Sequence, residues 1–238
     1  LRPGKSRKIP DVVLYGRGDA RMSSAPDCVE NCLAMLADAV AAKTRTVGDV
    51  VGDDTFFPDQ RWSPGMSWNN FGSNDATAAS ALSLDSNELI VRVTPGGPGQ
   101  SPLIAAPSYV SVTNEALTID AVPQTLALEH RINSREFRLY GEIPSGSAEW
   151  RERIGIDDPA DYAAHTFAGM LRTRGVKVTG KVLARHPRVD AGVLGRDQVA
   201  VDQVGMRLGQ RREPCPCPIG KDEPEQDKRA RIERRHRR

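Results

Sequence analysis

The stretch that decides the fold is residues 48–94, GDVVGDDTFFPDQRWSPGMSWNNFGSNDATAASALSLDSNELIVRVT. Its first part completes an apolar run, residues 46–53, that ends at the acidic pair Asp53-Asp54 and is typical of a β-strand meeting a loop. Aromatic residues then cluster among prolines and glycines. Such a loop would be costly to leave in water, so we expect Trp62 and Trp68 to be largely buried against the neighbouring sheet.

The second half of this stretch changes period. Residues 80–84 and 89–93 alternate apolar and polar side chains on either side of Asp85-Ser86-Asn87. Alternation of this kind around a short polar turn predicts a β-hairpin.

Towards the N-terminus the pattern indicates a strand followed by a helix. Residues 11–15 (DVVLY) are a short apolar run. The apolar residues that then recur at helical spacing are Val29, Leu33, Leu36 and Val40. With residues 46–53 as the next strand, this order predicts a βαβ unit whose helix packs on its own strands.

Towards the C-terminus the chain becomes rich in short strands and then returns to helix. The predicted strands are residues 109–113, 117–122, 125–130 and 136–141. Asp158-Pro159 is a helix start signal. The face predicted before Gly175 consists of Tyr162, His165 or Thr166, Met170 and Leu171. Residues 176–183 then alternate as a strand.

These elements predict an α+β fold. An α/β part (residues 1–75 and 145–188) carries an inserted antiparallel β-rich module (residues 76–144). Residues 189–238 lack apolar periodicity and are rich in proline and charge, so we expect a disordered basic tail.

Charge is distributed unevenly along the chain. The whole sequence has 33 basic and 31 acidic residues, of which residues 205–238 hold 11 and 6, leaving 22 and 25 for the rest. A mildly acidic body gives no electrostatic reason to bind nucleic acid through the fold. The basic tail could bind polyanions nonspecifically, but we favour an unselected tail. The sequence shows neither a transmembrane span nor a signal peptide.

Three ordered blocks, GDVVGDDTFF, RWSPGMSWNN and SALSLDSNELIVRVTPG, resemble the region between the catalytic motifs of class C low-molecular-mass penicillin-binding proteins. These are serine D-alanyl-D-alanine carboxypeptidases and endopeptidases. The resemblance spans roughly residues 10–185. It implies a periplasmic or extracellular enzyme that trims peptidoglycan stem peptides, and it leads us to expect that this chain is a fragment covering mainly the insertion domains.

The catalytic motifs that this resemblance implies are a nucleophilic serine followed by lysine three residues later, S-x-N, and Lys-Thr-Gly. No serine has a lysine at that spacing, and Lys-Thr-Gly does not occur. The S-x-N match, Ser67-Trp68-Asn69, falls in the aromatic loop, where we interpret it as a structural turn. We therefore assign no catalytic residue to this chain.

Other reactive residue types lack the spacing that a site requires, so we predict no metal and no cofactor. We interpret Asp53 and Asp54 as a solvated strand end rather than a carboxylate pair. Cys28 and Cys32, four residues apart on the predicted helix, are expected to be free thiols, because an intrahelical bridge is sterically awkward. Cys215-Pro216-Cys217 lies in the expected tail.

The two histidines that fall in predicted elements, His130 and His165, have no serine or cysteine partner at a recognisable spacing, so we interpret both as structural. Arg17-Gly18-Asp19 spells an adhesion tripeptide, which we interpret as a glycine turn.

Two hypotheses of different class follow. In the first, the chain is a catalytically incomplete piece of a serine-type D-Ala-D-Ala carboxypeptidase, which would react with β-lactams only as part of the full catalytic domain. In the second, it is a stand-alone, non-enzymatic binding or scaffold module that contacts peptidoglycan through the aromatic loop.

Overall fold

The computed structural model describes residues 9–67, 70–71, 76–121, 123–187, 200–202 and 205–206. Its α-helices are α1 (Leu33–Ala41) and α2 (Pro159–Thr173), and a short 3-10 helix, η3 (Asp85–Asn87), precedes β4. The strands are β1 (Val12–Tyr15), β2 (Thr46–Val47), β3 (Val50–Asp53), β4 (Glu88–Thr94), β5 (Leu103–Ala105), β6 (Ser111–Asn114), β7 (Leu117–Ile119), β8 (Ala127–His130), β9 (Glu136–Tyr140), β10 (Glu142–Pro144), β11 (Trp150–Gly155), β12 (Lys177–Val178), β13 (Val182–Arg185), β14 (Ala200–Asp202) and β15 (Gly205–Met206). The mixed α and β content that the sequence predicts is confirmed.

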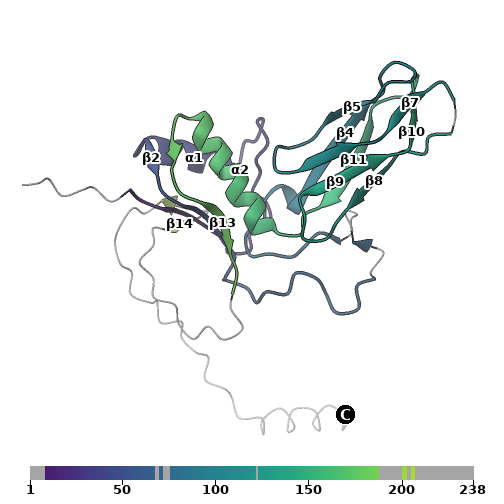
Figure 1. Ribbon diagram of the computed structural model, residues 1–238. Helices are drawn as coiled ribbons and strands as arrows, with labels where there is room; N and C mark the ends of the chain where they lie inside the picture. The colour runs from purple at the N-terminus through teal and green to yellow at the C-terminus, as the bar shows by residue number, and fades with distance from the viewer. Residues whose placement is uncertain are drawn as a thin grey trace, which may run out of the picture. The chain divides into compact units, whose positions relative to one another are not determined.

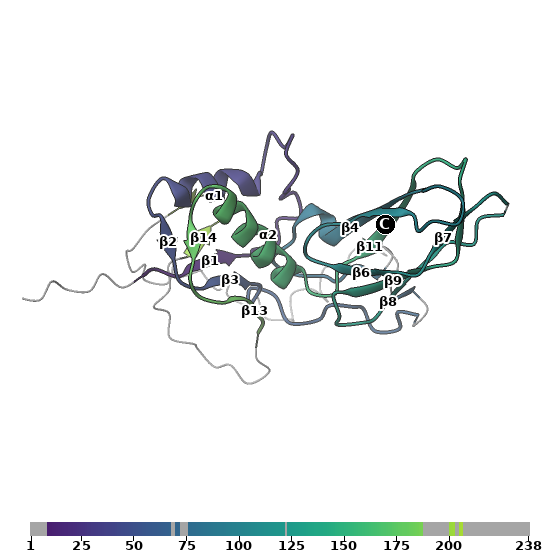
Figure 2. The same ribbon diagram turned by 45° about the horizontal axis from the view of Figure 1, so that its top comes forward.

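The main sheet has the strand order β13-β3-β1-β14-β15, and its first four strands are parallel. Helices α1 and α2 lie side by side over one face of this sheet (Figure 2). The predicted β1–α1–β3 unit is therefore present. Strands β14 and β15 fall within the segment predicted to be disordered, and the rest of residues 189–238 lies outside the described residues.

The start of α1 differs from the prediction. Leu33 and Val40 are buried as expected, whereas Val29 is 87% exposed and precedes the helix. Asn31 has a φ of 56°, a left-handed conformation that ends any continuous helix there. Cys28 and Cys32 form a disulfide with Cα atoms 5.7 Å apart. The prediction of free thiols was wrong, because it placed both cysteines inside one helix.

Two long strands predicted from the sequence are each divided in two. Residues 46–53 split into β2 and β3, and residues 176–183 split into β12 and β13. The breaks lie next to each other: Gly180 N donates to Gly48 O at 3.0 Å. A Cβ on Gly180 would lie 2.1 Å from Asp49 Oδ1, so glycine is required for this approach.

The β-rich part is built from the small sheets β11-β4-β5, β6-β9-β8 and β10-β7 (Figure 1). The predicted hairpin around Asp85-Ser86-Asn87 was wrong: β4 pairs with β11 and β5 instead. All three turn residues have positive φ, so η3 redirects the chain without pairing the segments on its two sides. The prediction of an antiparallel module also needs correction, because β6 pairs parallel to β9 and β10 parallel to β7.

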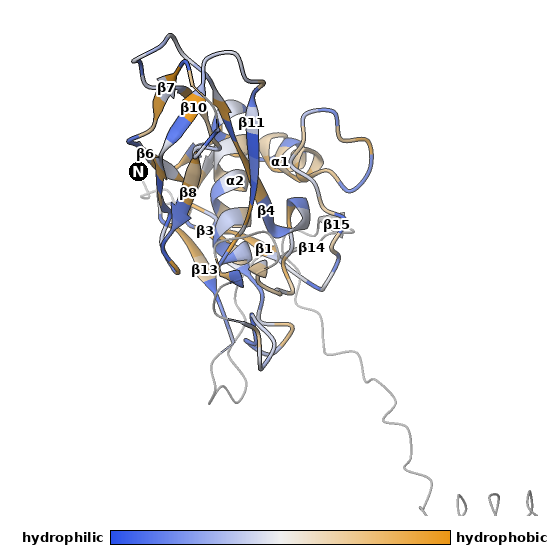
Figure 3. Ribbon diagram, turned by 90° about the vertical axis from the view of Figure 1, so that its right-hand side faces the viewer, coloured by the Kyte–Doolittle hydropathy of each residue, from blue (hydrophilic) through white to orange (hydrophobic). Residues whose placement is uncertain are grey.

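One apolar cluster connects the helices, the main sheet and the β-rich strands. Phe167 of α2 is fully buried in it with Leu14 of β1 and Leu139 of β9. Alternate side chains of β4 are buried, and hydropathy varies from residue to residue along the strands (Figure 3). In the described part of the chain, no helix is both long enough and apolar enough to cross a membrane.

Candidate functional site

Charged side chains meet at the carboxyl ends of β3 and β13. The two strands pair in parallel with Asp53 opposite Arg185, and Arg185 donates to Asp53 Oδ2 at 3.0 Å. Asp54 follows the last residue of β3 and His186 follows the last residue of β13, so the parallel pairing also brings these two side chains together. The carboxyl ends of parallel strands are where ligands usually bind in α/β proteins, which makes this edge the first place to test for chemistry.

The N-terminus of α2 adds a third acid to this edge. Asp158 caps the helix by accepting a hydrogen bond from Asp161 N at 3.0 Å, and Pro159 follows it as the sequence predicts. Helix termini leave backbone N–H groups unpaired, which explains why an aspartate begins α2. The capping carboxylate also faces His186.

His186 bridges two carboxylates. Its Nδ1 lies 2.9 Å from Asp54 Oδ1 and its Nε2 lies 3.1 Å from Asp158 Oδ2. Hydrogen bonds to Asp158 and then to Asp54 raise the pKa of His186 to about 10. Burial pushes the pKa of Asp158 up, but the hydrogen bond from His186 and that from the Asp161 amide outweigh it and leave this pKa lowered. A pKa this high favours the protonated ring at neutral pH, whereas the guanidinium of Arg61, whose NH2 lies 3.0 Å from His186 Nε2, opposes a proton on that nitrogen.

Arg61 ties the aromatic loop to the same cluster. Its NH1 donates to Asp157 O at 2.9 Å, and its NH2 lies 3.3 Å from Asp158 Oδ2. Ser80 completes the group by donating from Oγ to Asp54 Oδ2 at 3.0 Å. We call Arg61, Ser80, Asp54, Asp158 and His186 the edge cluster.

The edge cluster holds a serine, a histidine and an acid in an order that does not activate the serine. In a catalytic triad the imidazole accepts the serine proton, and the acid orients the imidazole. Here the serine donates to Asp54, while both ring nitrogens of His186 face carboxylates. The hydrogen bonds of the edge cluster connect the aromatic loop, the main sheet and the N-terminus of α2.

The structure corrects the prediction of a solvated strand end. Asp53 and Asp54 are 5% and 7% exposed. Each finds a cation across the β3–β13 pair, in Arg185 and His186. Sequence reasoning overlooked His186 because it follows the last predicted strand. The sequence did contain a signal for His186: ionisable residues stand at the C-terminal ends of both segments, Asp53-Asp54 after one and Arg185-His186 after the other. Parallel pairing of the two strands places these residues at one edge of the sheet.

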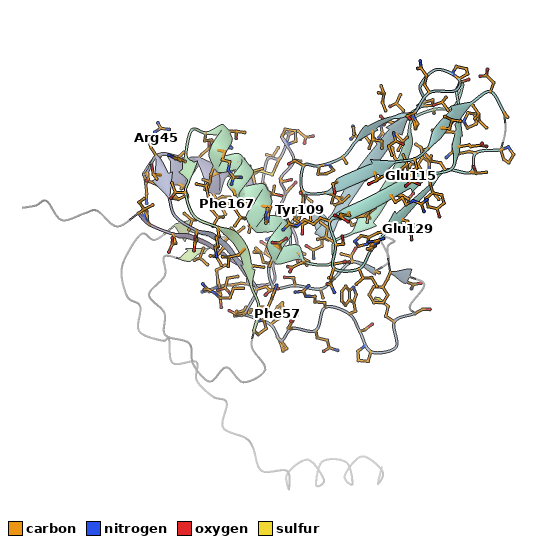
Figure 4. All side chains as sticks on the ribbon, in the orientation of Figure 1. Arg45, Phe57, Tyr109, Glu115, Glu129 and Phe167 are labelled. Carbon is orange, nitrogen blue, oxygen red and sulfur yellow. A yellow bond between two sulfur atoms is a disulfide. The ribbon has the colours of Figure 1, made fainter. Side chains whose placement is uncertain are left out.

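The predicted S-x-N turn is described only in part. Ser67 is exposed and its carbonyl accepts from Asn70 N at 3.1 Å, whereas Trp68 and Asn69 lie outside the described residues. Trp62 is half-buried rather than largely buried, and its Nε1 donates to Ala76 O at 2.8 Å. Phe56 and Phe57 are 52% and 45% exposed, so part of this loop faces solvent instead of packing on the sheet (Figure 4 labels Phe57).

His130 and His165, which we interpreted as structural, contact residues outside the edge cluster. His165 Nδ1 lies 2.9 Å from Asp161 O, one turn earlier in α2. His130 stacks on Phe137 with ring centroids 4.5 Å apart.

Gly18, in the tripeptide after β1, has a φ of 88° and donates from N to Ala81 O at 2.7 Å, the geometry of a packed turn. Within the described residues no group of three His, Cys, Asp or Glu side chains is arranged to hold a metal ion.

The fold is similar to that of a solved structure. Penicillin-binding protein 4 from Haemophilus influenzae superposes with a TM-score of 0.57 at 19% sequence identity, over 72% of this chain and 38% of that one. At this identity the likeness concerns the fold alone.

Sequence comparison identifies the family. The model of the D-Ala-D-Ala carboxypeptidase 3 (S13) family matches residues 3–200. A D-alanyl-D-alanine carboxypeptidase from Actinomadura sp. (strain R39) is 31% identical over 191 residues, which is 76% of this chain and 35% of that protein. The chain belongs to the D-Ala-D-Ala carboxypeptidase S13 family, as the sequence resemblance predicts. It spans about a third of the length of this relative.

Proposed function

We propose that this chain is a non-catalytic portion of a serine-type D-Ala-D-Ala carboxypeptidase acting on peptidoglycan stem peptides. The main observation in support is that the family model matches residues 3–200, although the sequence contains neither S-x-x-K nor Lys-Thr-Gly. The chain contributes the sheet, α2 and the β-rich strands as a scaffold. The nucleophile and its lysine come from sequence that this chain does not contain.

The geometry of the edge cluster supports this proposal. An unactivated serine hydroxyl is a poor nucleophile at neutral pH, and Ser80 donates its proton to a carboxylate that is already paired with an imidazolium. Binding interactions elsewhere in the scaffold cannot replace activation, because only contacts that strengthen in the transition state accelerate the reaction.

A location outside the cytoplasm is part of the proposal. The Cys28–Cys32 disulfide supports it, since disulfides persist in oxidising compartments and are rare where thiols are kept reduced.

Labelling with a fluorescent penicillin tests the proposal directly. The chain, incubated with the reagent and separated by denaturing electrophoresis, is expected to show no covalent band, while the full-length Actinomadura relative serves as the positive control. A stoichiometric band on this chain would overturn the proposal. Its loss in Ser67→Ala or Ser80→Ala would identify the nucleophile.

The DNA around the coding region gives an independent test of the same proposal. We expect S-x-x-K to be encoded upstream of Leu1 and Lys-Thr-Gly downstream, in the same or a shifted frame. Intergenic sequence on both sides would contradict the proposal.

A second candidate function, a non-enzymatic peptidoglycan-binding module, is favoured by the exposure of Phe56 and Phe57. It predicts that purified peptidoglycan sediments the chain and that Phe56→Ala with Phe57→Ala abolishes sedimentation. The matched control is Leu103→Ala, which removes an apolar side chain that is 71% exposed on β5. Equal sedimentation of all variants would exclude a role for the aromatic loop.

A further inference from the structure

A cavity of about 200 Å³ opens beyond the carboxyl end of β3 and shares Asp54 and Ser80 with the edge cluster. The segments that line it are Asp54 with residues 57–60 after β3, residues 79–81 before η3, and Pro187 after β13. Figure 4 shows Phe57 of this lining at the lower end of the main sheet. Ligands of α/β proteins usually bind in crevices outside the carboxyl ends of the strands, yet the proposed scaffold role leaves this cavity unused.

Phe57 forms the aromatic part of the lining and is held in place by the turn after β1. A Cβ on Gly18 would lie 2.7 Å from Cζ and 2.9 Å from Cε2 of the Phe57 ring, so the tip of the ring packs against a backbone position that requires glycine. The residue is nevertheless 45% exposed, and the exposed surface belongs to the rest of the ring. A ring that is already held by its tip loses little freedom when a ligand packs on it, which favours binding.

The rest of the apolar lining consists of small or rigid side chains. Pro58 and Pro187 contribute their rings, and Ala79 and Ala81 contribute methyl groups. These side chains lose no rotamer freedom when a ligand covers them. The volume is below the roughly 300–1,000 Å³ of pockets that take drug-sized ligands, so the cavity fits a single ring.

The acids of the cavity are balanced by cations of the protein itself. Asp54 faces His186 Nδ1 at 2.9 Å, and Asp59 Oδ1 lies 3.3 Å from Arg61 Nε. None of the described residues that line the cavity is basic. An anionic ligand would therefore find no cation in the lining, and a cationic ligand would find no acid without a partner. This balance favours a neutral ligand.

Two polar groups at the rim have unused capacity for hydrogen bonds. Asp59 Oδ2 and the side-chain amide of Gln60 make no hydrogen bond with the part of the chain that the structure describes, and both residues are exposed. A carboxylate oxygen accepts hydrogen bonds, and an amide both donates and accepts them. Together they match a neutral ligand whose edge carries hydroxyl groups.

We propose that this cavity binds one pyranose ring of a glycan. The C–H groups of a pyranose ring are weakly electropositive and suit the negative face of an aromatic ring, which Phe57 supplies. The hydroxyl groups at the edge of the sugar reach Asp59 and Gln60. The choice of a glycan rests on the proposed function, since peptidoglycan presents sugar rings beside its stem peptides. The inference assigns the sugar strand, and not the peptide, to this part of the chain.

Ligand-observed NMR titration of the full chain tests the proposal with two sugars and one peptide. The sugars are chitotriose and cellotriose, which share their linkage and differ in carrying an acetamido group or a hydroxyl at C2; the peptide is N-acetyl-D-Ala-D-Ala. We expect a Kd on the order of 1 mM for at least one trisaccharide, which is typical of so small a ligand, and no binding of the peptide. Binding of chitotriose alone would show that the acetamido group is recognised, and equal binding of both sugars that the ring suffices. Penicillin labelling does not involve this cavity, so the proposed function and the sugar site can fail independently.

Matched variants locate the site. Phe57→Ala removes the aromatic surface and is expected to weaken sugar binding at least tenfold. Tyr140→Ala removes an aromatic ring that is 39% exposed on β9, outside the cavity, and is expected to bind as the parent chain does. Ala79→Leu, at an exposed position, fills the cavity and should abolish binding even if Phe57→Ala fails to fold. Absence of binding by both trisaccharides, binding of the peptide with the same affinity, or equal affinity in Phe57→Ala and Tyr140→Ala would overturn the proposal.

Discussion

Two hydrogen-bonded groups each include a residue of α2 or its N-cap, and they hold their carboxylates in different ways. In the edge cluster, Asp54 and Asp158 face the imidazolium of His186. Asp85, in η3, instead accepts from neutral donors: Ser23 Oγ at 3.1 Å, Ser24 N at 2.7 Å, Ser24 Oγ, and Tyr162 Oη at 3.1 Å. The first arrangement depends on a proton, and the second depends on backbone geometry.

The cost of each arrangement differs accordingly. Asp85 has a φ of 52°, a conformation that costs a non-glycine residue roughly 1–2 kcal/mol, and its hydrogen bonds offset that cost. Burial raises the pKa of Tyr162 to about 12, with the nearby Asp85 carboxylate as the next cause, so this hydroxyl remains a donor across the physiological range. The edge cluster has ordinary backbone geometry but needs His186 to stay protonated.

The serine hydroxyls of the two groups make the same kind of contact. Ser24 and Ser80 each donate to a carboxylate, and neither donates to a neutral base. Hydroxyls in both groups therefore hold segments together, and the two groups differ in how they respond to substitution and to pH.

The largest effect is expected at Asp85. Asp85→Ala removes the acceptor of several donors and keeps a left-handed conformation that alanine disfavours, so we expect a loss of about 3 kcal/mol in the free energy of unfolding. Asp85→Asn, which tolerates this conformation and retains one acceptor oxygen, should lose about half as much. Urea unfolding at pH 7 measures both. A change below about 0.5 kcal/mol in Asp85→Ala would show that the hydrogen bonds do not carry this turn.

A smaller but pH-dependent effect is expected at His186. Its folded pKa, about 10, lies above the ordinary 6.5, so its contribution is complete below pH 6.5 and is lost as the pH rises through 10. His186→Gln should cost about 2 kcal/mol at pH 6, because an amide cannot bridge two carboxylates as a cation. The measurement is the difference in unfolding free energy between the two proteins from pH 6 to 10, which should shrink towards pH 10. A constant difference would mean that His186 acts through packing alone.

Local signals were sufficient to predict α2. Asp158, Pro159 and Gly175 mark its ends within the segment itself, and the buried face of Tyr162 and Leu171 has helical spacing. The strand positions in the β-rich part were also predictable from alternation, because side-chain period is a local property.

Features that depend on distant partners were not predictable in the same way. Residues 80–84 alternate as a hairpin arm would, yet β4 pairs with β11, whose position across the sheet no local pattern specifies. Val29 matches the helical spacing, but Asn31 begins a different local geometry in which Cys28 and Cys32 meet. His186 became meaningful only once β3 and β13 were known to be neighbours.

The smallest effect, and the sharpest test of the comparison, comes from deleting one serine hydroxyl in each group. Ser80→Ala removes one hydrogen bond to Asp54, and Ser24→Ala removes one to Asp85, so each should lower the free energy of unfolding by about 1 kcal/mol at pH 7. Their pH responses should differ, however. When His186 loses its proton near pH 10, Asp54 loses its cationic partner, so the Ser80→Ala effect should change between pH 6 and 10. The Ser24→Ala effect should stay constant, because the donors to Asp85 in the described part of the chain are neutral. Urea unfolding of both variants at these two pH values gives the result, and identical pH responses would show that the two groups are not distinct in the way their contacts indicate.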